Sequence, residues 1–136
     1  MDSTAWADAL HREAIFYSDL ATGETTRLTA RTEDAIAPKS EACVFSPDGK
    51  WLAFTAASDS RVHLWLRSLI DDRANALEGT EGASHPFWSP DSRAVAFFAA
   101  GKLKKVELGT GVPATLCPAS VGTGGTWSRD GVILFT

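Results

Sequence analysis

Three aspartates of this sequence, Asp48, Asp91 and Asp130, each stand two residues after a serine. Paired carboxylates can act as acid and base, and two of them on either side of a glycosidic bond can hydrolyse it. A serine can act as a nucleophile when a neighbouring base activates it. A short pattern that occurs three times can equally have a repeated structural role. The residues around each copy decide between these interpretations.

The surroundings of the three aspartates are nearly the same. The copies read FSPDGKWLAF from Phe45, WSPDSRAVAF from Trp88 and WSRDGVILF from Trp127. Each has an aromatic residue, a Ser-(Pro/Arg)-Asp-(Gly/Ser) stretch typical of turns, and then apolar residues two apart, which is the spacing of one strand face. We therefore predict a strand, a tight turn and a second strand in every copy. In this interpretation the serines and aspartates bond to the turn backbone instead of catalysing a reaction.

The motif assigns two structural roles to its residues. The predicted turn residues are Ser46, Pro47, Asp48, Gly49, Ser89, Pro90, Asp91, Ser128, Asp130 and Gly131. The residues predicted to pack between neighbouring sheets are Phe45, Trp88 and Trp127 before the turns and Phe54, Phe97 and Phe135 after them. We expect no catalytic residue among them.

A second tract also occurs three times. It reads IFYSDLATGETTRL from Ile15, LWLRSLIDDRANAL from Leu64 and LKKVELGTGVPATL from Leu103, and the copies align without a gap. Each copy has a leucine at the sixth and at the fourteenth place, with turn-forming residues between them. The second tract therefore predicts another strand, turn and strand.

The two tracts alternate along the chain with a period of about 40 residues, so that each period holds four antiparallel strands. This is typical of β-propeller blades. We predict an all-β fold that is a partial β-propeller. Its parts are a half blade at 14–29, whole blades at 42–79 and 86–118, and a half blade at 125–136. Residues 1–13 form an extension whose pattern is compatible with a short helix.

Composition excludes several function classes. The 136 residues suffice for one modest domain, and a net charge of −4 argues against nucleic-acid binding, because the longest basic cluster is the short KLKK at 102–105. No apolar stretch approaches the roughly 20 residues of a membrane helix, so we expect no membrane insertion. The first residues lack the basic and apolar parts of a signal peptide. This predicts a cytoplasmic protein if the chain is complete, and a periplasmic or other extracytoplasmic one if it is a fragment of an exported protein.

Metal and cofactor chemistry has little support in the sequence. The histidines His11, His63 and His85 share no spacing with potential companion ligands. Cys43 and Cys117 are too sparse for a disulfide framework or a zinc site, and we predict that both are small buried hydrophobic residues. We therefore expect no metal site and no cofactor.

The strings FSPDGKWLAF, PFWSPDSRAVAFF and GTWSRDGVILF resemble the TolB-like β-propeller repeat, the Pro-Asp variety of the WD-type blade. The resemblance covers about residues 14–136. The run from His63 to Leu108 is similar to propeller regions attached to bacterial serine/threonine protein kinases. Related blades occur in the propellers of prolyl-oligopeptidase and dipeptidyl-peptidase relatives. The resemblance implies a binding or gating platform with no catalytic residue on the blade motif.

The resemblance thus implies a non-catalytic binding or scaffold module of a bacterial signalling or envelope protein, with a protein or peptide partner. The alternative is an accessory sensor or gating propeller of an enzyme, either a serine/threonine kinase or a prolyl-oligopeptidase-like peptidase. A glycan-hydrolysing propeller is a third option. Two whole and two half blades fall short of the roughly 4–8 blades of a closed ring. The remaining blades of a longer chain could complete the ring, a second copy of this chain could do so, or the blades could form an open stack.

Overall fold

The computed structural model describes residues 16–18, 20–27, 37–58, 60–71 and 73–136. Within these ranges all regular structure is β-strand, and none of it is a helix long and apolar enough to cross a membrane. The short helix considered for residues 3–13 lies outside the described ranges. The strands are β1 (Phe16–Ser18), β2 (Thr25–Arg27), β3 (Ala37–Phe45), β4 (Trp51–Ser58), β5 (Arg61–Ser68), β6 (Ala74–Ala76), β7 (Ser84–Trp88), β8 (Ala94–Ala99), β9 (Lys102–Glu107), β10 (Pro113–Pro118), β11 (Gly125–Trp127) and β12 (Ile133–Phe135).

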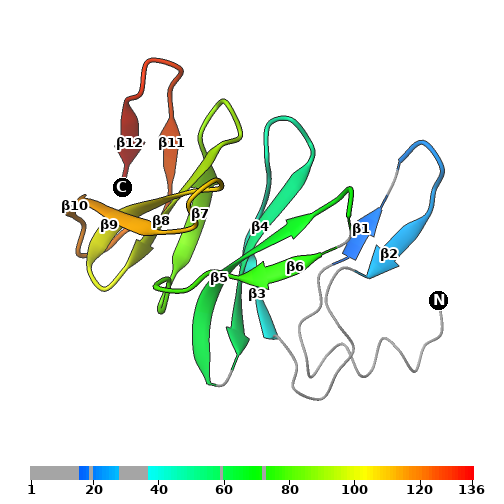
Figure 1. The fold of residues 1–136 in the computed structure, drawn as a ribbon, viewed down its shortest axis with the longest axis horizontal. Coiled ribbons are helices and arrows are strands. Elements are labelled where there is room, and N and C mark those ends of the chain that lie inside the picture. The colour runs from blue at the N-terminus through cyan, green and yellow to red at the C-terminus, as the bar shows by residue number, and fades with distance from the viewer. Residues whose placement is uncertain (1–15, 19, 28–36, 59, 72) are drawn as a thin grey trace.

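The strands form two four-stranded antiparallel sheets, β3-β4-β5-β6 and β7-β8-β9-β10, and two two-stranded sheets, β1-β2 and β11-β12. Figure 1 shows these sheets side by side in chain order. We call them half blade 1 (β1–β2), blade 2 (β3–β6), blade 3 (β7–β10) and half blade 4 (β11–β12). This arrangement confirms the predicted all-β partial propeller, in which two whole blades are flanked by two half blades.

The innermost strand of blade 2 is longer than the motif suggested. β3 begins at Ala37, ahead of residue 42, where we predicted the blade to start. A register shift between Pro38 and Cys43 explains the difference. Before the shift β3 pairs with the end of β4, and after it β3 pairs with residues nearer the start of β4. The polar stretch before the motif therefore contributes backbone to the sheet.

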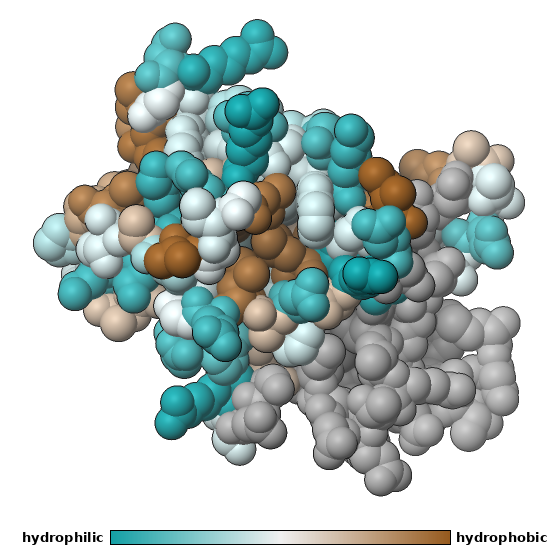
Figure 2. All heavy atoms as spheres, viewed as in Figure 1, coloured by the Kyte–Doolittle hydropathy of each residue, from teal (hydrophilic) through white to brown (hydrophobic). Residues whose placement is uncertain are grey.

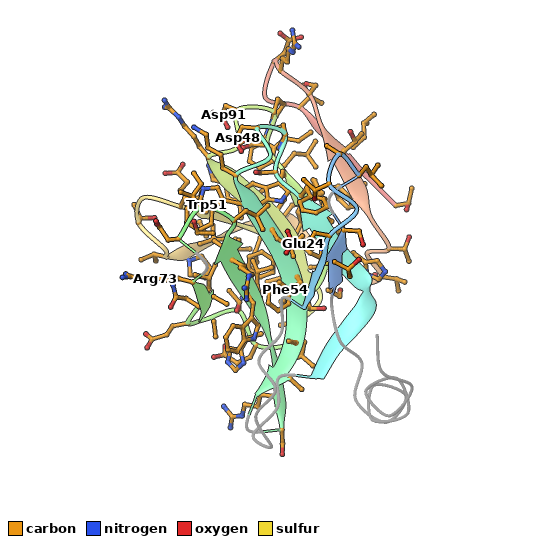
Figure 3. The ribbon with its side chains drawn as sticks, turned by 90° about the vertical axis from the view of Figure 1, so that its right-hand side faces the viewer. Glu24, Asp48, Trp51, Phe54, Arg73 and Asp91 are labelled. Carbon is orange, nitrogen blue, oxygen red and sulfur yellow. The ribbon has the colours of Figure 1, made fainter. Side chains whose placement is uncertain are left out.

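The hydrophobic core lies between the blades. The largest cluster joins Leu64 and Leu66 of blade 2 to Trp88, Val95 and Phe97 of blade 3. Another joins blade 3 to half blade 4, and a third lies on the opposite face of blade 2, around Phe54, on the side of half blade 1 (Figure 3). Because each blade buries one face against the next, the contacts between successive sheets hold the fold together.

The β8–β9 hairpin contains an unfavourable turn residue. Its two-residue loop has φ values of 53° at Ala100 and 71° at Gly101, and alanine is strained in this left-handed region. We expect Ala100→Asn to raise the free energy of unfolding by about 0.5–1 kcal/mol, because asparagine tolerates this conformation. Urea denaturation measures the change. The same substitution at the exposed Ala114 of β10 is the control and should give no gain.

Candidate functional site

The turn of the first motif copy is closed by its own serine and aspartate. The Ser46 hydroxyl donates to Asp48 Oδ1 at 2.6 Å and accepts from the Trp51 backbone N–H at 3.0 Å. The Lys50 N–H donates to Asp48 Oδ1 at 3.0 Å. Gly49 has a φ of 73°, which only glycine adopts without strain. The carboxylate therefore has a complete structural role inside the turn.

The second copy repeats this network in blade 3. The Ser89 hydroxyl donates to Asp91 Oδ1 at 2.6 Å and accepts from the Ala94 N–H at 3.0 Å, and the Arg93 N–H donates to Asp91 Oδ1 at 3.1 Å. Asp48 and Asp91 lie at the same end of the molecule (Figure 3). Their hydrogen bonds hold the pKa of both carboxyls below the ordinary value, and the serine hydroxyl is the largest cause in each case. Both residues thus have the environment of structural carboxylates.

The third copy keeps only part of the network. The Ser128 N–H donates to the Val132 carbonyl at 2.8 Å, and the Ser128 hydroxyl accepts from the Val132 N–H at 3.1 Å. This turn is one residue shorter than the other two, with Arg129 in place of proline, and Asp130 is exposed. Gly131 takes the left-handed conformation with a φ of 82°. The hydrogen bonds that close the third turn therefore come from the serine and the backbone.

Ser92 links two blades through their turns. It occupies the place that glycine has in the first motif copy and has a φ of 62°, which is strained for a serine. Its hydroxyl accepts a hydrogen bond from the Asp48 backbone N–H at 3.0 Å. The substitution of serine for glycine thus costs local strain, and it supplies a contact between blade 2 and blade 3. The repeat gave no indication of this contact.

The lowered pKa of Asp48 and Asp91 predicts a pH-dependent stability. The unfolded chain titrates near the ordinary aspartate pKa of 3.8, whereas the folded carboxyls titrate lower. Their contribution is therefore present above pH 3.8 and is lost as the pH falls through the lowered folded pKa. We expect the urea midpoint of the wild type to drop between about pH 5 and pH 2, and the double variant Asp48→Asn/Asp91→Asn to drop less. If the urea midpoints of the two proteins fell equally with pH, this prediction would be contradicted.

The motif aromatics differ in burial. Trp88 is 7% exposed and its Nε1–H donates to the Val44 carbonyl of blade 2 at 2.9 Å, while Phe54 and Phe97 are 1% and 0% exposed. Trp127 is partly buried against the cluster between blade 3 and half blade 4. Trp88 and Phe97 lie in the cluster shared by blade 2 and blade 3, and Phe54 lies in the cluster on the other face of blade 2.

Phe45 and Phe135 are more exposed than the other motif aromatics, with exposed fractions of 50% and 40%, although the ring of Phe135 contacts Phe98 of blade 3. Trp88 shows the reason, because this motif position packs on the innermost strand of the preceding blade. In the described part of the chain, half blade 1 contains β1 and β2, which correspond to the two outer strands of a blade. Phe135 stands on β12, whose outer edge has no paired strand in the described part of the chain.

A cleft of about 540 Å³ opens between blade 3 and half blade 4, at the end of the molecule that carries the motif turns. Its charged side chains have both signs, and Lys105 Nζ lies 3.6 Å from Glu107 Oε1. Figure 2 shows hydrophobic side chains exposed over half blade 4. The residues that line the cleft are Ser89, Pro90, Asp91, Ala94, Lys105, Glu107, Trp127, Ser128, Arg129 and Gly131. The motif gave no indication of the cleft, because Lys105 and Glu107 come from the other tract.

The other polar residues of the described ranges are the candidates for a metal centre. In the described ranges, no group of three histidine, cysteine, aspartate or glutamate side chains could hold a metal ion. His63 Nε2 lies 3.4 Å from Glu81 Oε1 and joins β5 to the segment before β7. The prediction that both cysteines are buried is wrong for Cys43, which is exposed in β3, whereas Cys117 packs partly buried beside half blade 4.

Comparison with known proteins gives matches among solved structures. No family model and no curated protein matches the sequence. TolB from Acinetobacter baumannii is 27% identical with a TM-score of 0.68 over 92% of this chain and 32% of that chain. An oligogalacturonate lyase in complex with manganese is 30% identical with a TM-score of 0.57, over 82% and 31%. The β-propeller domain of the Trilobed protease from Pyrococcus furiosus is 20% identical with a TM-score of 0.54, over 64% and 31%. The chain spans about a third of the length of each.

Proposed function

We propose that this chain, a TolB-like β-propeller segment of two whole and two half blades, is a non-catalytic module that binds a protein or peptide segment. The observation that carries the proposal is the cleft between blade 3 and half blade 4, which is lined by the motif turn that leads into β12. The outer edge of β12 has no paired strand in the described part of the chain. A free strand edge can accept a further strand, and a neighbouring cleft can accept its side chains.

The edge of β12 presents backbone groups suited to strand addition. Ser128 and Val132 form a hydrogen-bonded pair between β11 and β12. Because successive residues of an antiparallel strand bond to opposite sides, Ile133 and Phe135 direct their N–H and C=O groups to the free edge. A bound segment would satisfy these groups by main-chain hydrogen bonds, which do not depend on its sequence.

The cleft supplies the features that would select the segment. Trp127 offers an aromatic surface, and Lys105, Glu107 and Arg129 offer charges of both signs around it. An apolar side chain flanked by charged residues fits this lining. The carboxylate of Asp91 is already engaged in its turn, which favours binding over hydrolysis at this place.

A second candidate function is the accessory propeller of an enzyme. The likeness to the propeller domain of the Trilobed protease favours it, although at 20% identity this likeness concerns the fold. This candidate predicts that the reading frame around the chain encodes peptidase or kinase motifs. In that case the same cleft would face the enzyme's own domain or its substrate.

A displayed library of random peptides selected on the immobilised chain tests the binding function. We expect enriched peptides that alternate apolar residues with polar ones, and their affinity should fall about tenfold with Arg129→Glu, since the charge lies at the cleft. The control is Arg61→Glu, an exposed arginine at the start of β5, which should bind as the wild type does. The proposal would be wrong if no enriched peptide bound the Arg129→Glu variant more weakly than the Arg61→Glu variant.

A further inference from the structure

We propose that the segment bound at the cleft inserts an aromatic side chain beside Ala94 and pairs a neighbouring acidic residue with Arg129. The inference rests on the proposed binding of a protein or peptide segment at the cleft, and it names the chemistry of that segment. The interface between blade 2 and blade 3, which we call the closed interface, is built from equivalent strands and turns. It shows what occupies this place when the chain fills it with its own side chains.

The first difference between the two interfaces is at the residue where the strand after the motif turn begins. Trp51 holds this position in blade 2, and Ala94 holds it in blade 3. The Trp51 N–H donates to the Ser46 hydroxyl at 3.0 Å, and the Ala94 N–H donates to the Ser89 hydroxyl at the same distance. Trp51, labelled in Figure 3, packs against the cluster of the closed interface, whereas Ala94 lines the cleft. The chain therefore has an indole at one interface and a methyl group at the other.

The second difference is on the neighbouring strand. Leu66 of β5 pairs with Ala53, and Lys105 of β9 pairs with Ala96 at the equivalent place. Leu66 is 6% exposed and belongs to the cluster of the closed interface. The side chain of Lys105 is 34% exposed and lines the cleft. A cation with a long methylene stem thus replaces an apolar wall, and such a side chain can lie along an aromatic ring.

The third difference removes a hydrogen bond between turns. At the closed interface the Ser92 hydroxyl accepts from the Asp48 N–H, which joins the motif turns of blade 2 and blade 3. Gly131 holds the position of Ser92 in half blade 4 and has no hydroxyl to offer to the turn of blade 3. All three differences are on strands and turns that both interfaces possess. They are therefore properties of the side chains and do not depend on any strand outside the described residues.

These differences indicate an aromatic occupant. The place that the Trp51 indole fills at the closed interface is open at the cleft, because Ala94 stands there. Trp127 and the stem of Lys105 also line the cleft and offer apolar surface to a ring beside Ala94. The cleft volume of about 540 Å³ lies within the roughly 300–1,000 Å³ of ligand pockets. It therefore accommodates one aromatic side chain and parts of the residues that flank it.

The charges around the cleft favour an acidic neighbour for the aromatic residue. Lys105 Nζ lies 3.6 Å from Glu107 Oε1, so these two charges compensate each other. The Asp91 carboxylate is bound inside its turn and is attracted by the charge of Arg93. Arg129 is exposed and forms no ion pair with any other residue that the structure describes. A guanidinium of this kind can bind a carboxylate by two parallel hydrogen bonds.

Ala94→Trp tests the place of the aromatic residue. The substitution gives blade 3 the residue that blade 2 has at this position, so that the protein's own indole fills the cleft. We expect the affinity for peptides enriched from the displayed library to fall by about 30-fold or more, because the peptide ring loses its place. The matched control is Ala76→Trp at an exposed position of β6, which adds the same side chain to blade 2 and should bind as the wild type does. Fluorescence anisotropy of a labelled peptide measures the dissociation constants.

Two further measurements keep the test decisive if the tryptophan variant loses its β-sheet, which circular dichroism verifies. Ala94→Leu fills part of the same volume and should weaken binding by about tenfold. An enriched peptide with alanine in place of its aromatic residue leaves the protein unchanged. This peptide should bind the wild type about 30-fold or more weakly than its parent does.

A charge exchange tests the partner of Arg129. An enriched peptide whose acidic residue is replaced by lysine should bind the wild type about tenfold more weakly than its parent does. The same lysine peptide should regain affinity for the Arg129→Glu variant, because the exchanged charges attract each other again. The Arg61→Glu variant is the control and should bind the lysine peptide as weakly as the wild type does.

The outcomes separate this inference from the proposed function. Enriched peptides that depend on Arg129 but contain no aromatic residue would leave the binding function in place and overturn the aromatic occupant. Aromatic peptides that bind Ala94→Trp or Ala94→Leu with full affinity would overturn it as well. If the lysine peptide gains nothing from Arg129→Glu, the acidic partner is wrong. If no enriched peptide depends on Arg129, the proposed function itself fails.

Discussion

Replacing Phe97 by alanine is expected to lower the free energy of unfolding by about 3–5 kcal/mol. The ring is fully buried in the cluster between blade 2 and blade 3, where it belongs to the same group as Trp88 and Leu64. Its removal takes away the transfer free energy of the ring and leaves a cavity that a rigid pair of sheets fills incompletely. Because a domain of this size is stabilised by roughly 5–15 kcal/mol, the loss is a large part of the total.

Phe135→Ala is the matched control for Phe97→Ala, since both phenylalanines occupy the same place in the motif. Phe135 is 40% exposed and contacts Phe98 with ring centroids 5.9 Å apart, so we expect a loss of about 1–2 kcal/mol. Guanidinium denaturation measures both losses. Equal losses for the two variants would show that the blades do not share the core described here.

The blades themselves could be predicted from the sequence because their signals are local. The turn bonds of Asp48 and Asp91 involve residues within the motif, and the spacing of two in the following strands depends only on backbone geometry. The alternation of two tracts then determines the order of the strands. This local information was sufficient for the sheet topology.

The environment of each motif residue could not be predicted in the same way, because it depends on the neighbouring blade. Phe45 and Trp88 have the same motif position, yet Phe45 is 50% exposed, whereas Trp88 is 7% exposed and donates a hydrogen bond to Val44 of β3. The Ser92 contact with Asp48 and the cleft around Lys105 also join segments from different repeats. A repeat pattern contains no information about what lies next to its first and last copies.

The contact between half blade 4 and blade 3 is another feature that depends on the neighbouring blade. Gly122 stands in the joint before β11. A Cβ atom at this glycine would lie 2.0–2.3 Å from three ring atoms of Phe98, which is 4% exposed. Packing therefore requires a glycine at this position. The backbone conformation does not, because the φ of Gly122 is not in the left-handed region.

Gly122→Ala is accordingly expected to lower the free energy of unfolding by about 1–3 kcal/mol, because the buried ring of Phe98 must move out of its packed position. Gly109→Ala is the control, since no atom lies within 4 Å of a Cβ at that position and the change should be neutral or slightly stabilising. The double variant Gly122→Ala/Phe98→Leu should cost less than the two single variants together, because leucine leaves room for the new methyl group. Simple additivity in this cycle, measured by chemical denaturation, would mean that the glycine is required for another reason than its contact with Phe98.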